Sequence, residues 1–185
     1  MSAFEKSRHE LRGEIEAAFA GVARDPEQSL HQAQLTDQGM SRRIPGREWM
    51  EAERRDRERS WTEVPGEALD ECDAALSHFT PESWRFYLPA YLCRSLSLFV
   101  PPDFNDSKLS SVLHQLTLWP PEADVGMRGY LLERYQSLTP AQHEAVRHFL
   151  ELVVQESLHL VETTNDHYQI YDAAKTALES YWERA

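Results

Sequence analysis

The 185-residue chain has only two cysteines and seven glycines, and it lacks any long apolar run. No stretch approaches the roughly 18 to 20 apolar residues that a membrane span needs, and the first residues alternate charges instead of forming an apolar signal segment. Cys72 and Cys93 do not form a C-x-x-C pair, so we interpret them as half-buried thiols in a reducing environment. We therefore expect a cytoplasmic protein that does not cross a membrane.

Two classes of chemical site are also missing from the sequence. No glycines are spaced as G-x-G or followed by Lys-Ser or Lys-Thr, which excludes the known loops that cradle phosphates. The chain has no Gly-x-Ser-x-Gly turn, and both cysteines have acidic or apolar neighbours that would raise a thiol pKa. The sequence therefore predicts no cofactor and supports no nucleophile.

Positive charge is scarce in the last two-thirds of the chain. Residues 1–60 contain 12 acids and 11 Lys or Arg, whereas residues 61–185 contain 19 acids and 8 Lys or Arg, and the net charge is −12. Such a surface repels a nucleic-acid backbone and attracts positively charged proteins, so we expect a basic protein partner and no nucleic acid. The arginine-rich segment 54–59 does not change this expectation, because its interleaved acids favour a salt-bridged helix.

Helix signals dominate the sequence. Apolar residues recur at helical spacing, as with Leu11 and Ile15 in the first helix, and no segment predicts a strand. The segment "TPAQ" predicts a helix start with Thr139 as N-cap, Pro140 in the first turn and Gln142 completing a capping box. We predict a single all-α domain over residues 1–185 with seven to nine helices, in which the arginine-rich N-terminal third (1–60) is more peripheral.

The segment "SWRFYLPAYL" (83–92) contains a proline between two helix-forming stretches. Pro89 cannot donate a hydrogen bond to the carbonyl of Arg85, so we predict a kink or a break in the helix there. Arg85 would contact an acid or a carbonyl, and the kink would let Tyr87 and Tyr91 splay. Two interpretations stay open: a kinked core helix with a structural arginine, or a binding surface.

Four stretches together resemble a known family: "RDRERSWTEVP" (55–65), "FTPESWRFYLPAYL" (79–92), "LTPAQHEAVRHFL" (138–150) and "ALESYW" (177–182). The chain resembles a family of small bacterial proteins catalogued only as a domain of unknown function, over about residues 50–182. In that pattern a glycine precedes a Phe-Arg step, where this chain has Ser83 and Trp84. The resemblance implies no activity, substrate or cofactor.

Three functions are compatible with these features. The first is a non-catalytic acidic protein-binding module, such as an immunity or antitoxin-like inhibitor of a basic protein; its candidate binding residues are Arg59, Trp61, Glu67, Asp70, Glu71, Asp73, Arg85, Tyr87 and Tyr91. The second is a metal-dependent helical enzyme, because Glu156 and His159 have the Glu-x-x-His spacing of di-metal sites, although no second such pair exists and a plain polar face is the favoured interpretation. The third is a structural or regulatory subunit that oligomerises through Tyr181, Trp182 and the Tyr87–Tyr91 pair.

Overall fold

The computed structural model describes residues 2–39, 46–98, 106–164 and 168–184, and within these ranges it contains helices and no strand. Nine are α-helices: α1 (Ala3–Ala18), α2 (Leu30–Asp37), α3 (Arg47–Arg55), α4 (Gly66–Glu71), α5 (Pro81–Leu98), α6 (Asp106–Leu116), α7 (Val125–Gln136), α8 (Pro140–Thr164) and α9 (Tyr168–Ala177). Two short 3-10 helices, η1 (Trp61–Glu63) and η2 (Ala75–Ser77), and a π-helical segment, η3 (Leu178–Trp182), complete the fold. The predicted single all-α domain is confirmed.

Local capping explains where two of the long helices begin. The side chain of Ser2 accepts a hydrogen bond from the backbone of Glu5, whose own carboxylate accepts from the backbone of Ser2, which starts α1. At α8, the Thr139 N–H donates to Gln142 Oε1 (3.0 Å) and the Gln142 N–H donates to Thr139 Oγ1 (3.3 Å). The capping box predicted from "TPAQ" is therefore confirmed, with Pro140 as the first helical residue.

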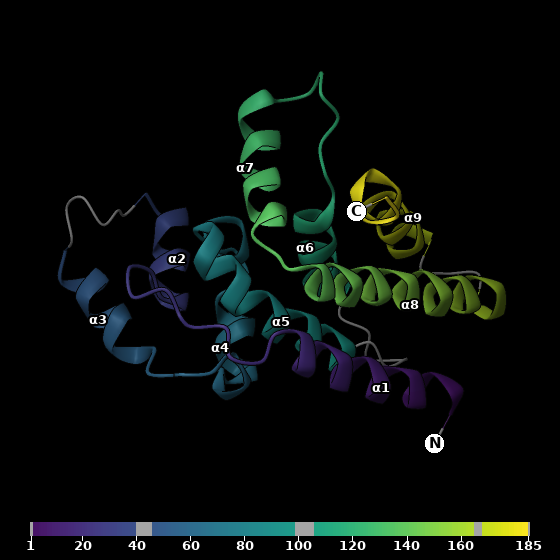
Figure 1. The fold of residues 1–185 in the computed structure, drawn as a ribbon, viewed down its shortest axis with the longest axis horizontal. Helices are drawn as coiled ribbons and strands as arrows, with labels where there is room; N and C mark the ends of the chain where they lie inside the picture. The colour runs from purple at the N-terminus through teal and green to yellow at the C-terminus, as the bar shows by residue number, and fades with distance from the viewer. Residues whose placement is uncertain (1, 40–45, 99–105, 165–167, 185) are drawn as a thin grey trace.

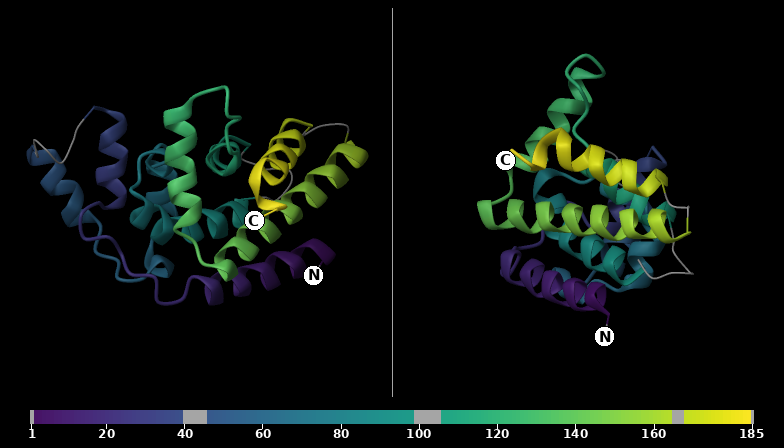
Figure 2. Two further views of the ribbon diagram at one scale, coloured as in Figure 1. Left: turned by 45° about the horizontal axis from the view of Figure 1, so that its top comes forward. Right: turned by 90° about the vertical axis from the view of Figure 1, so that its right-hand side faces the viewer.

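Helix α8 lies between α1 and α9, and the three are seen one above another in the right-hand view of Figure 2. Helix α6 packs against α9, and α5 contacts α1, α6 and α7 (Figure 1). Helices α2 and α3 pack on each other at the end of the molecule away from α8 and α9. Because α5 contacts so many elements, it positions most of the side chains considered below.

Helix α5 is continuous across Pro89, so of the two predicted outcomes, a kink or a break, the break does not occur and the kink stays a prediction. A proline inside a helix removes one backbone hydrogen bond and costs on the order of 3 kcal/mol. The large apolar side chains on both sides of it, among them Phe86, Leu88 and Leu92, are fully buried. Burying each such side chain contributes about 1.5–3 kcal/mol, which is enough in total to hold the helix together.

The first sixty residues contribute to the core as well as to the surface. Leu11, Ile15 and Phe19 of the α1 region belong to the same buried cluster as α5, whereas α3 buries only Trp49 and Ala52. The peripheral character expected for residues 1–60 therefore applies to α3 and not to α1. Within the described part of the chain, no helix combines the length and apolar character needed to cross a bilayer.

Candidate functional site

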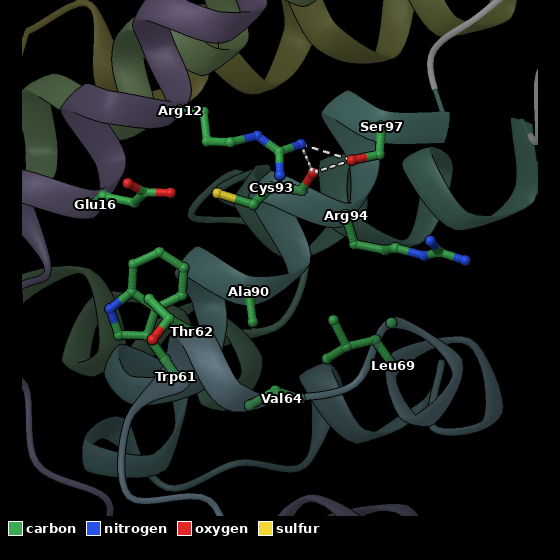
Figure 3. Close-up of a pocket in the computed structure, with 11 residues that line it drawn as sticks. Arg12, Glu16, Trp61, Thr62, Val64, Leu69, Ala90, Cys93, Arg94 and Ser97 are labelled. Carbon is green, nitrogen blue, oxygen red and sulfur yellow. Dashed lines mark hydrogen bonds between the residues drawn. The ribbon is translucent and has the colours of Figure 1, made fainter.

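A hollow of about 240 Å³ lies between α1, η1, the start of α4 and the second half of α5 (Figure 3). We call it the Trp61 hollow. It is lined by Arg12, Glu16, Trp61, Thr62, Val64, Gly66, Leu69, Ala90, Cys93, Arg94 and Ser97. The lining combines an aromatic ring and aliphatic side chains with two guanidinium groups, one carboxylate and two hydroxyls. Such a mixture can hold the stem and the polar end of one long side chain or small molecule.

Arg12 reaches from α1 across the hollow to α5 (Figure 3). Its Nη2 donates to the backbone oxygen of Cys93 (3.0 Å) and to Ser97 Oγ (2.6 Å). These acceptors lie in the last turns of α5, where the helix dipole attracts a positive charge. Glu16 follows one turn further along α1 and faces the same hollow, so α1 presents a cation and an anion side by side.

Arg94 lines the hollow from α5, and its guanidinium is paired with the carboxylate of Asp70. Its Nε donates to Asp70 Oδ1 (3.1 Å), and its Nη2 donates to Asp70 Oδ2. This hydrogen bonding raises the pKa of Arg94. A Cβ atom at Gly66 would lie 3.1 Å from Arg94 Nη1, so the glycine lets the guanidinium rest on the start of α4. Asp70 and Gly66 together fix the position of the Arg94 guanidinium.

The two thiols are poor nucleophiles. Cys93 lines the Trp61 hollow and is 9% exposed, and burial raises its pKa to about 11. Cys72 is 1% exposed, and burial, with nearby acids, raises its pKa to about 12. Since the thiolate is the reactive form, both side chains stay protonated and unreactive near neutral pH. The hollow is therefore suited to binding and not to thiol chemistry.

Four acids predicted to bind a partner lie in and just after α4, three of them exposed and Asp70 half-buried, and we call them the acidic ridge: Glu67, Asp70, Glu71 and Asp73. Bases from distant elements pair with three of them. Arg55 contacts Glu71 at 3.1 Å, and Lys108 contacts Asp73 at 3.6 Å, as Arg94 contacts Asp70. These bases make the electrostatic potential at the segment less negative than its sequence alone indicates.

In one of these pairs the carboxylate is clearly more exposed than its base: the Asp73 side chain is 55% exposed, whereas that of Lys108 is 23% exposed. In the other two pairs acid and base are about equally exposed, with 63% for Glu71 against 59% for Arg55 and 32% for Asp70 against 31% for Arg94. A protein that approaches this surface therefore meets the carboxylates of Glu71 and Asp73 directly.

The two tyrosines of α5 lie in the core. Tyr87 is fully buried; its hydroxyl donates to Glu58 Oε1 (2.6 Å) and accepts from the Leu30 N–H (3.2 Å). Tyr91 is 6% exposed, and its hydroxyl donates to the backbone oxygen of Cys72 (2.5 Å). Burial raises the pKa of both phenols well above the usual value of 10. The core packs on both tyrosines, so their rings are not available to a partner in this fold.

The remaining aromatic candidates also point inward. Trp182 is 1% exposed, and its Nε1 donates to the backbone oxygen of Leu116 (2.8 Å). Trp61 is 5% exposed, and its Nε1 donates to the backbone oxygen of Phe19 (3.1 Å). Trp182 therefore cannot mediate oligomerisation in this fold, whereas Trp61 still borders the hollow that bears its name.

Two arginine candidates have different surroundings. Arg85 is half-buried, and its Nε donates to the side-chain carbonyl of Gln142 (3.0 Å), so the expected contact with an acid or a carbonyl is confirmed. Arg59 is exposed, and its backbone N–H donates to Glu63 Oε2 (2.8 Å). Neither side chain lines the Trp61 hollow.

The Glu-x-x-His pair on α8 is divided between the interior and the surface. Glu156 is 3% exposed and is clamped by Arg8, whose Nε and Nη2 donate to its two oxygens at 2.9 and 2.7 Å. Burial raises the pKa of Glu156, although Arg8 opposes this. His159 is exposed, and its ring lies 5.5 Å from that of Phe4. Among the residues that the structure describes, no group of three or more His, Cys, Asp or Glu side chains is placed to hold a metal ion.

Sequence reasoning missed the charged pair of the hollow, Arg12 and Glu16. Their spacing of four residues places both on one face of α1, but nothing in the sequence shows that α5 lies opposite. Arg12 contacts residues more than eighty positions away, so only the folded chain reveals the site.

Comparison with known proteins adds a family but no activity. The model of DUF6714, a family of unknown function, matches residues 7–185. No curated protein and no solved structure matches the chain significantly.

Proposed function

We propose that this chain, which belongs to DUF6714, a family of unknown function, is a non-catalytic protein that binds a partner with a basic surface. An immunity or antitoxin-like inhibitor that covers a basic protein is the form of this function that we favour. The observation that carries the proposal is the exposure of the ridge carboxylates Glu71 and Asp73, whose side chains are 63% and 55% exposed despite their ion pairs. The proposal includes a cytoplasmic location, which the free thiols of Cys72 and Cys93 support.

Exposed ion pairs such as Arg55–Glu71 contribute only about 0–1 kcal/mol to stability. A partner's Lys or Arg can therefore share or replace the existing bases on the ridge at little cost to the fold. The net charge of −12 also steers a basic partner toward this protein. Both effects favour rapid and salt-sensitive association.

The Trp61 hollow adds a place for an anchoring side chain. Gly66 and Leu69 of α4 line the hollow, and Glu67 and Asp70 of the same helix belong to the ridge. Protein interfaces commonly combine a polar rim with a pocket that takes one large side chain. The stem of a partner's lysine or arginine would lie on the indole, with its charge near Glu16.

The test compares two variants with equal net charge. The ridge variant is E67Q/E71Q/D73N, and the control variant is E122Q/E162Q/D172N, in which three exposed acids of other elements are neutralised. Each tagged full-length protein is incubated with lysate of its native host at low salt. We expect wild type and control to retain the same basic protein, and the ridge variant to lose it.

Salt and activity measurements complete the test. Raising the salt to about 1 M, where the Debye length is about 3 Å, should release the partner. Inhibition of the purified partner by wild type but not by the ridge variant would support the inhibitor form. Equal retention by the ridge and control variants, or retention indifferent to salt, would contradict the proposal.

A further inference from the structure

The most unusual charged group in the described residues is Arg134 of α7, which has no exposed surface. Its Nε and Nη2 donate to the backbone oxygen of Phe79 (3.2 and 2.6 Å), its Nη1 donates to Gln115 Oε1 (3.2 Å), and Nη2 also donates to the hydroxyl of Tyr130. All of these acceptors are neutral oxygens. Burial lowers the pKa of Arg134 to about 10, so the side chain is still charged at neutral pH.

A buried charge without an opposite charge is costly. Arg8, which is also largely buried, pairs with the carboxylate of Glu156. The guanidinium of Arg134 is stabilised instead by neutral oxygens and by the ring of Tyr130, whose centroid lies 3.9 Å from its Cζ.

A hydrogen-bond relay leads from Arg134 toward the surface. A guanidinium can only donate, so the amide of Gln115 must turn its oxygen toward Arg134 and its nitrogen away. That nitrogen, Nε2, donates to Ser77 Oγ at 2.9 Å. Since Ser77 Oγ accepts this hydrogen bond, its own O–H is left to donate outward. The buried guanidinium of Arg134 thus orients the amide of Gln115, and this amide in turn orients the hydroxyl of Ser77 as a donor.

Ser77 and Gln115 border a second hollow of about 380 Å³, which we call the Ser77 hollow. It lies between η2 and α6, and its lining is completed by Asp73, Ala74, Ser110, Ser111 and His114. Hydroxyl groups, an amide and an imidazole therefore surround the end of the relay. The single carboxylate in the lining, Asp73, is paired with Lys108 at 3.6 Å.

We propose that the Ser77 hollow binds a phosphate group, with the Arg134–Gln115–Ser77 relay aiming a donor at one of its oxygens. Phosphate offers several acceptor oxygens, which suits a lining with three serine hydroxyls. The hollow is also larger than a phosphate ion, so it has room for the organic part of an ester. The site shares Asp73 with the acidic ridge, but it does not rest on the proposed binding of a basic partner.

The decisive variant is Q115E, which is nearly isosteric and gives two predictions of opposite sign. The new carboxylate accepts from Arg134 and supplies the missing counter-charge, so the unfolding temperature should rise. The same carboxylate accepts from the Ser77 hydroxyl and turns it inward, so phosphate binding should be lost. If Gln115 had a purely structural role, Q115E would not raise the unfolding temperature and abolish phosphate binding at the same time.

The serine itself is tested by S77A, with S7A as control because Ser7 lines a different groove and donates to the Ala3 carbonyl. Inorganic phosphate is titrated into the full-length protein at constant ionic strength, and the amide signals of Ser77 and Gln115 are followed by NMR. Wild type and S7A should show the same saturable shift. S77A should bind at least about tenfold more weakly, as expected for one lost hydrogen bond to a charged group.

Glycerol 3-phosphate distinguishes the two sources of the ligand. Tighter binding of this ester than of phosphate would assign the site to phosphate esters, and equal binding would assign it to free phosphate; both support the proposal. Shifts that do not saturate, or equal phosphate affinity in wild type, S77A and Q115E, would overturn it.

Discussion

Removing the guanidinium that faces Glu156 should destabilise the fold by an amount that grows with pH. The substitution R8M keeps most of the aliphatic stem but leaves the carboxylate of Glu156, 3% exposed, without its clamp. Breaking a buried pair in this way costs about 3–5 kcal/mol, and because the Arg8 side chain is 17% exposed we expect about 2–3 kcal/mol. In a chain of this size that lowers the unfolding temperature by about 4–12 °C.

Protonation limits this electrostatic cost. Burial raises the pKa of Glu156, and Arg8 opposes this rise. Without Arg8 the carboxyl can take up a proton instead of staying buried and charged, so the loss of stability cannot exceed the cost of that protonation.

The sign of the pH dependence follows from the raised pKa. A folded-state pKa above the unfolded value means that the stability from protonated Glu156 is fully present below the unfolded pKa and is lost as the pH rises through the folded pKa. R8M raises the folded pKa further, so the loss extends to higher pH. Urea unfolding at about pH 5 and about pH 7.5 should give a larger difference between R8M and wild type at the higher pH.

The double variant R8M/E156M separates the charge effect from packing. Replacing both members of a buried pair with apolar side chains of similar volume is generally neutral or stabilising, so it should recover most of the stability that R8M loses. A difference between R8M and wild type that is the same at both pH values, or a double variant no more stable than R8M, would refute the reasoning.

Three further predictions concern the core and the candidate sites. Y87F leaves the carboxylate of Glu58 without its buried donor and should cost about 1–3 kcal/mol in urea unfolding; a change below about 0.5 kcal/mol would contradict the hydrogen bond in solution. Cys72 and Cys93 should react with a thiol reagent at mildly alkaline pH only after unfolding, and rapid reaction of the native protein would contradict their raised pKa values. Addition of Zn(II), Mn(II) or Fe(II) should leave the unfolding temperature unchanged, whereas a rise would revive the metal hypothesis for Glu156.

The parts of the fold that were predicted correctly depend on neighbours in sequence. Thr139, Pro140 and Gln142 form their capping box within four residues, so the start of α8 could be located from the sequence. For Pro89, equally local rules predicted a kink or a break, and the helix continues without a break. Helix α5 is buried by several other helices, and that packing free energy cannot be estimated from the residues beside the proline.

The acidic ridge shows why a charge count along the sequence is incomplete. Residues 61–84 contain six acids and no Lys or Arg, which indicates an unopposed negative segment. The bases that pair with it come from α3, the second half of α5 and the start of α6. A window of sequence gives the charge of a segment, but the potential at its surface depends on helices that enter from elsewhere.

Arg134 makes the same point for a single residue. In the segment "LLERYQ" it follows Glu133 directly, and adjacent opposite charges on a helix normally indicate a solvated surface. In the fold Glu133 is exposed, whereas Arg134 is fully buried against Phe79 and α6, because neighbouring residues on a helix point in different directions. The sequence rule is therefore correct for Glu133 and wrong for Arg134. The free-energy cost of an unpaired charge depends on its surroundings. The buried charge on which the phosphate proposal rests is therefore created by the packing of α7 and not by its local sequence.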